Sequence, residues 1–347
     1  TMYESSQTLR RACTLCFTFL LALSFALPLA TPALAAEDRA ALFDQARAAL
    51  LTPAEMGIQS GEYTLRTGDS AYVPSLNAPI IPYDELETAT VPTQNGTFES
   101  TDTSIVTVDE AGLMTGVSAG STVVTHHAQE GDRTYLVTVS DDAMPEGIKN
   151  YIYVLNREFT EVKRARLPKY NKYAKWYYGR KNEVGWCSVF TIYCANASGN
   201  NPVKKKSLDL VPPPTVQFLR EGQVGNQFDG FMQMERFGGV PKAGYLVIYA
   251  DMNNSYRTVH IASVVSVRDM GEGIYAVTTV EGNMSNSVKS YCYLYDSNKD
   301  NHMVGTEDGL KLQNNMAALP VEEQTDPLVQ YDLHTDHWSV FGFCQTW

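Results

Sequence analysis

The sequence has no excess of positive charge and, after its first thirty or so residues, no long apolar run. Lys and Arg number 27 against 39 Asp and Glu, which gives a formal net charge of −12. This balance argues against a protein whose main partner is nucleic acid, and against one that adheres to membranes through basic residues. Hydrophobic residues (44%) and charged residues (19%) are close to globular averages, which excludes a disordered chain and a multi-span membrane protein. A chain of 347 residues has room for about two domains.

The N-terminal segment has the pattern of a secretory signal peptide. Arg10 and Arg11 precede an apolar run over residues 13–29, and small residues follow at 33–36. We therefore expect residues 1–36 to be cleaved and the mature protein to be secreted or associated with the cell wall, without stable membrane insertion. A single-pass anchor is the alternative, but the run is short and Pro28 interrupts it.

Four cysteines remain in the expected mature protein: Cys187, Cys194, Cys292 and Cys344. An exported chain usually pairs its thiols, and an even number permits two disulfides. Cys194 follows Cys187 by two helical turns on the same helix face, so we expect it to be a buried packing thiol. Cys292 and Cys344 are then left to form a disulfide that ties the C-terminal tail to the preceding strands.

Composition and periodicity divide the rest of the chain. We predict a helical segment at 37–60, an all-β domain at 61–140, a linker at 141–170, a domain of mixed helices and strands at 171–320, and a C-terminal tail at 321–347. Within the all-β part, residues 100–128 (STDTSIVTVDEAGLMTGVSAGSTVVTHHA) resemble the bacterial Ig-like group-2 family, with a turn at 109–112. The resemblance implies one β-sandwich module, which would bind a wall or surface glycan or protein, or serve as a spacer.

The second half of the chain has an α+β pattern. Helical spacing predicts helices over 146–163 and 185–197, the second with an apolar face and an end at Gly199. Apolar runs predict strands over 245–250, 258–267 and 275–280. A helix followed by an antiparallel meander is typical of α+β folds. Aromatic residues crowd residues 170–178, where they either line a binding groove or pack the domain edge.

Four residues in this half form a candidate catalytic set. Cys187 stands at the first turn of an apolar helix, where the helix field favours the thiolate. His260 opens the apolar strand HIASVVSV and can accept and return a proton at neutral pH. Glu281 and Asn283 follow the next strand, where an acceptor can fix the orientation of the imidazole.

These residues and their flanks resemble the CHAP family of cysteine, histidine-dependent amidohydrolases and peptidases. The resemblance covers Trp186-Cys187 at the helix start, PKAG (241–244) before the strand YLVIYA, His260 in VHIASVV, and TVEGN (279–283). It implies a papain-like catalytic domain that cleaves an amide in peptidoglycan, either the N-acetylmuramoyl-L-alanine bond or a peptide crosslink. The family usually has Asp after the strand-opening glycine, where this chain has Tyr245.

The resemblance also implies a role for each residue. Cys187 would be the nucleophile, His260 the general base and then acid, and Glu281 with Asn283 the orienting groups, with no metal or organic cofactor. The Cys187 backbone N–H and a second donor would hold the oxyanion; Tyr178 is a candidate for that donor.

Structural roles remain as alternatives for all four. Cys187 can be half of a disulfide or a core thiol, His260 a core histidine, Asn283 a turn residue, and Glu281 structural if Asn283 alone orients the imidazole. At the level of the whole protein, one rival is a non-catalytic wall or surface binding protein. A second rival is an enzyme of the same type that cleaves host or self proteins.

Two segments contain spacings typical of metal sites. Residues 296–307 copy the oxygen spacing of a calcium loop and place Glu307 at the twelfth position, but Asn301 replaces the usual glycine. His334, Asp336 and His337 form a short-spaced zinc-like set without a fourth ligand. Solvated polar loops explain both segments better, so we expect no metal.

Overall fold

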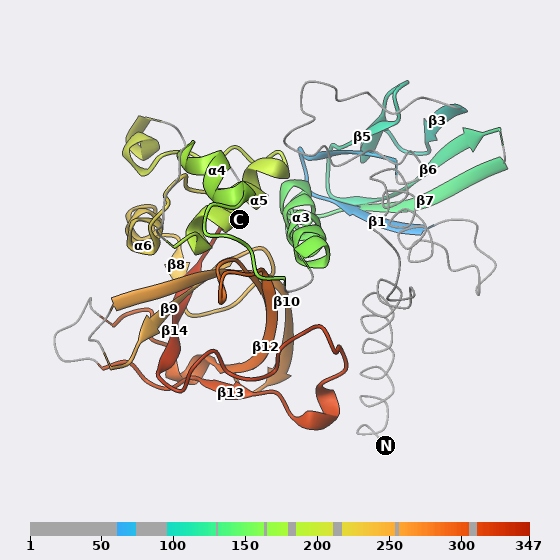
Figure 1. The fold of residues 1–347 in the computed structure, drawn as a ribbon. Coiled ribbons are helices and arrows are strands. Elements are labelled where there is room, and N and C mark those ends of the chain that lie inside the picture. Colours follow the sequence, from blue (N-terminus) through green and yellow to red (C-terminus); the bar gives the residue numbers. More distant parts are fainter. Residues whose placement is uncertain are drawn as a thin grey trace, which may run out of the picture. The chain divides into compact units, whose positions relative to one another are not determined.

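The computed structural model describes residues 61–73, 96–129, 131–162, 165–179, 185–210, 217–253, 257–304 and 311–347, which fall into two compact units (Figure 1). The predicted signal peptide (1–36) and helical segment (37–60) lie outside the described residues. No helix in these described ranges is long and apolar enough to span a membrane.

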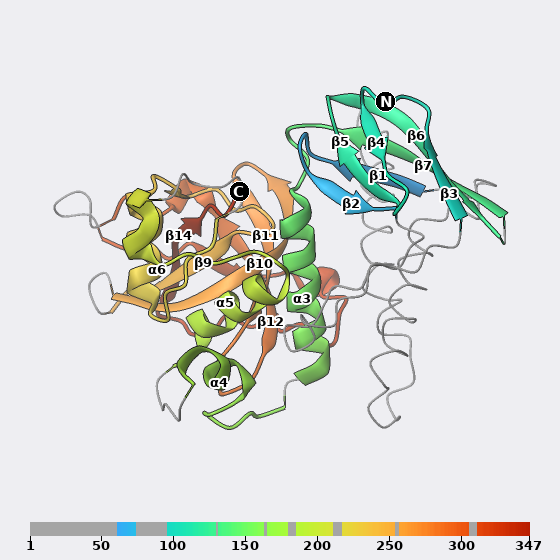
Figure 2. The ribbon, with the colours of Figure 1, turned by 90° about the horizontal axis from the view of Figure 1, so that it is seen from above.

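The first unit is a β-sandwich. Its described strands are β1 (Gly61–Leu65), β2 (Ser70–Tyr72), β3 (Gly96–Ser100), β4 (Val106–Val108), β5 (Leu113–Gly116), β6 (Gly120–Ala128) and β7 (Gly131–Val139). They form a four-stranded sheet, β1-β7-β6-β3, and a three-stranded sheet, β2-β5-β4, which can be followed in Figure 2. Strand β1 pairs parallel to β7, and the other pairs are antiparallel.

Alternating burial in these strands explains the sandwich. In β1 and at the end of β7, every second residue is buried, so one face of the sheet is apolar. Leu65, Val106, Met114, Val124 and Val137 from both sheets share one core. The turn predicted at 109–112 is present, and Asp109 Oδ1 accepts hydrogen bonds from the backbone N–H groups of Ala111 and Leu113, each at 2.8 Å.

The second unit combines helices with one large sheet. Its described helices are α3 (Glu146–Val162), α4 (Lys172–Tyr178), α5 (Cys187–Ala197) and α6 (Val224–Gln233), with short 3-10 helices at Lys205–Leu210, Ser297–Lys299 and Val321–Glu323. The strands are β8 (Phe237–Gly238), β9 (Leu246–Asp251), β10 (Arg257–Gly271), β11 (Ile274–Glu281), β12 (Lys289–Asp296), β13 (Met316–Ala318) and β14 (Trp338–Cys344). They are ordered β13-β12-β11-β10-β9-β14-β8, with antiparallel neighbours.

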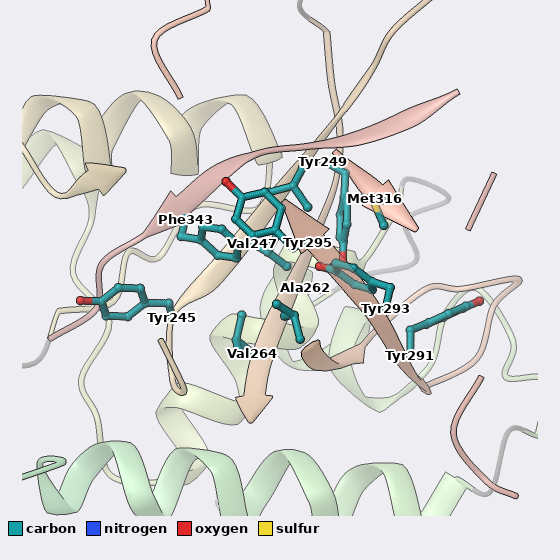
Figure 3. Close-up of a cluster of buried hydrophobic side chains, with 12 residues drawn as sticks. Tyr245, Val247, Tyr249, Ala262, Val264, Tyr291, Tyr293, Tyr295, Met316 and Phe343 are labelled. Carbon is teal, nitrogen blue, oxygen red and sulfur yellow. The ribbon is translucent and has the colours of Figure 1, made fainter. Parts of the chain in front are cut away.

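This sheet is strongly curved. Three strands lie between β12, which carries Tyr295, and β14, which carries Phe343. In a flat sheet, four spacings of about 4.8 Å would therefore put these two strands about 19 Å apart. The ring centroids of Tyr295 and Phe343 are nevertheless 5.2 Å apart, and the Tyr295 hydroxyl donates to the carbonyl of Gly239. The hollow of the sheet is filled by its own side chains, among them Tyr249, Tyr293 and Met316 (Figure 3).

Helices α4, α5 and α6 gather on one side of the sheet (Figure 1), where α5 and α6 pack against its middle strand, β10. In the neighbouring strand β9, the residues from Leu246 to Ala250 are all buried. Helix α5 differs from the prediction of a single apolar face, because all but two of its residues are buried. It packs against β10, β11, α4 and α6 together, which explains an apolar surface on all sides.

Two predicted domain boundaries are corrected by the structure. The predicted linker (141–170) contains α3, whose apolar face belongs to the second unit; the Tyr151 hydroxyl lies 2.6 Å from Ser263 Oγ of β10. The predicted tail (321–347) supplies β14, which lies between β9 and β8 inside the sheet. Both elements depend on pairing and packing between segments far apart in sequence, which local periodicity does not reveal.

The predicted disulfide between Cys292 and Cys344 is also absent. All four described cysteines are free thiols. Cys344 is fully buried on β14, and Cys292 is half-buried on β12 opposite Thr278 of β11. Cys194 is fully buried, as predicted for a packing thiol.

A matched pair of glycines tests the packing of the residues just before β9 against α3. Gly244 and Gly271 have φ of 89° and 90°, but an added Cβ would lie 2.3 Å from Ile148 Cγ2 at Gly244 and meet nothing within 4 Å at Gly271. We expect Gly271→Ala to lower the free energy of unfolding by about 1–2 kcal/mol, the cost of this backbone conformation for alanine. Gly244→Ala should lower it by about 1–3 kcal/mol more, because Ile148 must move.

Urea unfolding followed by tryptophan fluorescence measures both variants, because all four tryptophans lie in the second unit. Equal costs for the two variants would contradict the close approach at Gly244.

Candidate active site

Cys187 is the first residue of α5. Its N-cap residue, Trp186, is fully buried and stacks on Tyr173 with ring centroids 5.3 Å apart, which fixes the start of the helix. The next residue, Ser188, donates a 2.6 Å hydrogen bond to the carbonyl of Glu221. Cys187 itself is half-buried. A thiol held at this position lies in the positive field of the helix N-terminus.

His260 lies near the start of β10, which begins at Arg257, one residue before the strand predicted over 258–267. The pairing of β10 with β9 shifts register between Thr258 and His260, so a bulge precedes the imidazole. Bulges redirect the side chains that follow them. The His260 ring stacks on both Tyr249 and Trp338, at centroid distances of 5.9 and 5.5 Å.

Glu281 is the last residue of β11 and is fully buried. His260 Nε2 lies 3.0 Å from Glu281 Oε2. Since a carboxylate only accepts hydrogen bonds, this contact places a hydrogen on Nε2 and leaves Nδ1 for the Cys187 thiol, with which His260 also forms a hydrogen bond. The structure therefore brings Cys187, His260 and Glu281 into one chain of hydrogen bonds.

A close approach between β11 and α5 makes this alignment possible. A Cβ at Gly282 would lie 2.4 Å from the Cβ of Phe190, so only glycine allows the end of β11 to come this near to the helix. Gly282 thereby brings the strand end that carries Glu281 next to the first turns of the helix that begins at Cys187.

Asn283 occupies a different place from the predicted one. It lies in a turn with a left-handed backbone (φ 67°), and its Nδ2 would be 3.3 Å from a Cβ at Gly185. Among the hydrogen bonds of the described residues, none joins Asn283 to His260. The imidazole is oriented by Glu281, and Asn283 lies beside the residues that precede Cys187.

The protonation equilibria of the three groups shift together. Burial alone would raise the pKa of the Cys187 thiol, but the hydrogen bond and charge of His260 and backbone hydrogen bonds lower it below its usual value. Burial opposes the charged form of His260 too, yet the bonds to Cys187 and Glu281 raise its pKa to about 10. Both shifts favour a proton on His260 over a proton on Cys187.

Glu281 completes this electrostatic arrangement. Burial would raise its pKa, but the interactions with His334 and His260 outweigh burial and hold the pKa far below its usual value. A buried carboxylate that stays ionised stabilises an imidazolium beside it.

His334 contacts this carboxylate as well, a role that its place in the sequence does not reveal. Its Nε2 lies 2.9 Å from Glu281 Oε1, whereas Asp336 pairs with His337 at the surface. His334 is thus engaged elsewhere than with Asp336 and His337, its neighbours in the zinc-like spacing.

In the segment with calcium-loop spacing, for which a solvated polar loop was expected, Asp296 pairs with Lys299 at 3.0 Å, and Glu307 lies outside the described residues. Across the part of the chain that the structure describes, no group of three or more His, Cys, Asp or Glu residues could hold a metal ion.

The aromatic residues of α4 divide between packing and the site. Tyr173 is fully buried, whereas Trp176, Tyr177 and Tyr178 are half-buried. Burial, Tyr177 and Cys187 all raise the pKa of Tyr178. Tyr178 therefore stays protonated at neutral pH.

The reactivity of Cys187 tests the geometry without any substrate. We expect iodoacetamide to alkylate Cys187 with a pH midpoint below the value of about 8.5 for an ordinary thiol, because His260 stabilises the thiolate. His260→Ala should raise this midpoint and slow alkylation at pH 7 on the order of tenfold, the ratio for one pKa unit.

Peptide mapping by mass spectrometry separates Cys187 from half-buried Cys292, whose pKa is raised chiefly by burial, and Cys292→Ser is the control. An unchanged midpoint in His260→Ala would show that the imidazole does not activate the thiol.

Comparison with known proteins identifies part of the first unit. Residues 84–139 match the family model for the bacterial Ig-like domain (group 2). No curated protein matches the chain. The match confirms the Ig-like prediction over these residues, and in the structure β1 and β2, which precede the matched range, pair with β7 and β5 of the same unit. This chain therefore carries a bacterial Ig-like group-2 domain.

Proposed function

We propose that this protein is an exported, wall-associated cysteine hydrolase that cleaves an amide bond in peptidoglycan. The observation that carries the proposal is the geometry: Cys187 begins a buried helix, and His260 lies 3.0 Å from the buried carboxylate of Glu281. The interaction of His260 with Cys187, which lowers the pKa of the thiol and raises that of the imidazole, supports it. A packing role needs no such alignment of a thiol at a helix start, an imidazole and a buried carboxylate. The resemblance of the flanking residues to the CHAP family supports peptidoglycan as the substrate and a papain-like mechanism.

The chemistry follows from the positions of the three groups. The Cys187 thiolate attacks the amide carbonyl carbon, and a tetrahedral oxyanion forms. His260 gives its proton to the leaving amine, the C–N bond breaks and an acyl-enzyme remains. His260 then takes a proton from water, which attacks the thioester, and the collapse of the second tetrahedral intermediate releases the carboxylic acid and restores the thiolate. Glu281 keeps the imidazole oriented and stabilises its charged form in both steps.

Peptidoglycan hydrolysis tests the proposal directly. The mature protein should release new amino groups from purified peptidoglycan, and Cys187→Ala should release none, because the acyl-enzyme cannot form. Product masses identify the bond: muramoyl-alanine or a peptide crosslink. Cys292→Ala is the matched control for loss of a thiol and should retain activity.

If neither wild type nor Cys187→Ala releases amines while both bind the wall equally, Cys187 is not a nucleophile on this substrate, and a non-catalytic wall-binding protein becomes the better explanation. If the wild type cleaves proteins but not peptidoglycan, the mechanism stands with a different substrate.

Tyr178 is the proposed second donor to the oxyanion, beside the Cys187 backbone N–H. Burial and the charges of Tyr177 and Cys187 raise the pKa of its hydroxyl, which therefore keeps the proton that a donor needs. We expect Tyr178→Phe to lower kcat about 10²–10³-fold, the usual cost of one oxyanion donor, with little change in KM. Alkylation of Cys187 should keep its wild-type pH midpoint, since the hydroxyl acts on the tetrahedral intermediate. An unchanged kcat in Tyr178→Phe would remove Tyr178 from this role.

A further inference from the structure

A second histidine shares the candidate catalytic carboxylate. His334, in the segment between β13 and β14, has a side chain that is only 1% exposed, and its Nε2 lies 2.9 Å from Glu281 Oε1. Glu281 thus lies between two imidazoles that come from segments 74 residues apart in sequence (334 − 260 = 74). The proposed mechanism uses His260 and leaves His334 without a role.

The two oxygens of Glu281 are used differently. Oε1 accepts hydrogen bonds from His334, from the Tyr249 hydroxyl at 3.2 Å and from the Thr279 hydroxyl. Oε2 accepts from His260 at 3.0 Å. One oxygen is therefore anchored by three donors, while the other is directed at the imidazole that contacts the nucleophile.

The residues around the His334 ring are aromatic, so packing alone would be satisfied by any aromatic ring of similar size. Its ring stacks on Tyr291 and Trp338, with centroids 4.2 and 5.7 Å away, and contacts Tyr249 at 4.7 Å. Its Nδ1 is buried and has no hydrogen-bond partner among the residues that the structure describes. A phenyl ring would fill this space without leaving a buried nitrogen unsatisfied. The contact with Glu281 is the interaction that only the imidazole supplies.

We propose that His334 is a positioning residue, which holds Glu281 Oε1 so that Oε2 stays directed at His260. The inference rests on the proposed catalytic roles of Cys187 and His260. A glutamate side chain has three rotatable bonds, and the anchored oxygen fixes the last of them. His260 then keeps its Nε2 hydrogen toward Glu281 and its Nδ1 toward Cys187.

Two substitutions of His334 separate positioning from packing. His334→Phe keeps the stacked ring and removes the donor, whereas His334→Gln keeps an N–H donor of similar reach. We expect His334→Phe to slow iodoacetamide alkylation of Cys187 at pH 7 about tenfold and to raise its pH midpoint by about one unit, because a less fixed carboxylate stabilises the imidazolium less. His334→Gln should restore the rate to within about threefold of wild type, less than half of one pKa unit.

Cys344→Ala is the control for stability, because Cys344 is fully buried in β14 and has no part in the Glu281 contacts. It should lower the unfolding midpoint and leave the alkylation profile unchanged. An alkylation profile in His334→Phe equal to that of wild type would reduce His334 to a packing residue and overturn the proposal.

NMR of the 15N-histidine-labelled wild-type protein keeps the test decisive if His334→Phe does not fold. Both His260 and His334 should show a hydrogen-bonded Nε2 proton, and Glu281→Gln should shift both. A His334 signal that Glu281→Gln leaves unmoved would overturn the proposal. Alkylation and NMR need no wall substrate, so a failure to cleave peptidoglycan refutes the proposed function alone.

Discussion

The second unit is organised around the buried carboxylate of Glu281. A carboxylate with no exposure to solvent is costly unless it is fully hydrogen-bonded, and four donors from three strands and one loop satisfy this one. Removal of any donor leaves part of a buried charge uncompensated. The surrounding strands must therefore keep their registers, and the same constraint fixes the imidazole of His260 relative to Cys187.

The curvature of the sheet and the close approach of β11 to α5 make this arrangement possible. The curled sheet brings the hydroxyl of Tyr249, on β9, to the carboxylate of Glu281 at the end of β11. The hydroxyl of Tyr293, on β12, lies 2.9 Å from the Tyr249 hydroxyl (Figure 3). Gly282 lets β11 touch α5 at Phe190. The site is thus held by packed strands and a buried helix start, which are the rigid parts of a fold and suit a mechanism that depends on alignment.

Two kinds of module are joined in this chain. The bacterial Ig-like domain is a sandwich with its own apolar core, whereas the second unit buries its polar groups in hydrogen-bonded clusters. Besides Glu281, Glu158 on α3 is fully buried and accepts a 2.7 Å hydrogen bond from Tyr173, with Lys172 and Arg157 paired to it. Glu158 connects α3 to α4, and none of the interactions of the described residues joins it to Cys187, which distinguishes a structural cluster from the candidate site.

The sequence alone determined the local elements and the chemical candidates. Turn residues and alternation located the Ig-like strands, helical spacing located α3 and α5, and the order of Cys187, His260 and Glu281 singled out the residues that the structure brings together. These features depend on neighbours along the chain, so a pattern can reveal them. The domain boundaries and the disulfide were predicted wrongly because they depend on pairing and packing between segments that are far apart in the sequence.

Only the tertiary structure decided where β14 inserts, how far the sheet curls, and which acceptor orients His260. The bulge before His260 and the contact of Gly282 with Phe190 determine where the side chains of His260 and Glu281 point. Sequence periodicity reveals neither the bulge nor the contact. His334 illustrates the limit most clearly. In the sequence it stands beside Asp336 and His337 and reads as part of a metal set, yet burial in an aromatic cluster turns it toward a carboxylate 53 residues away along the chain.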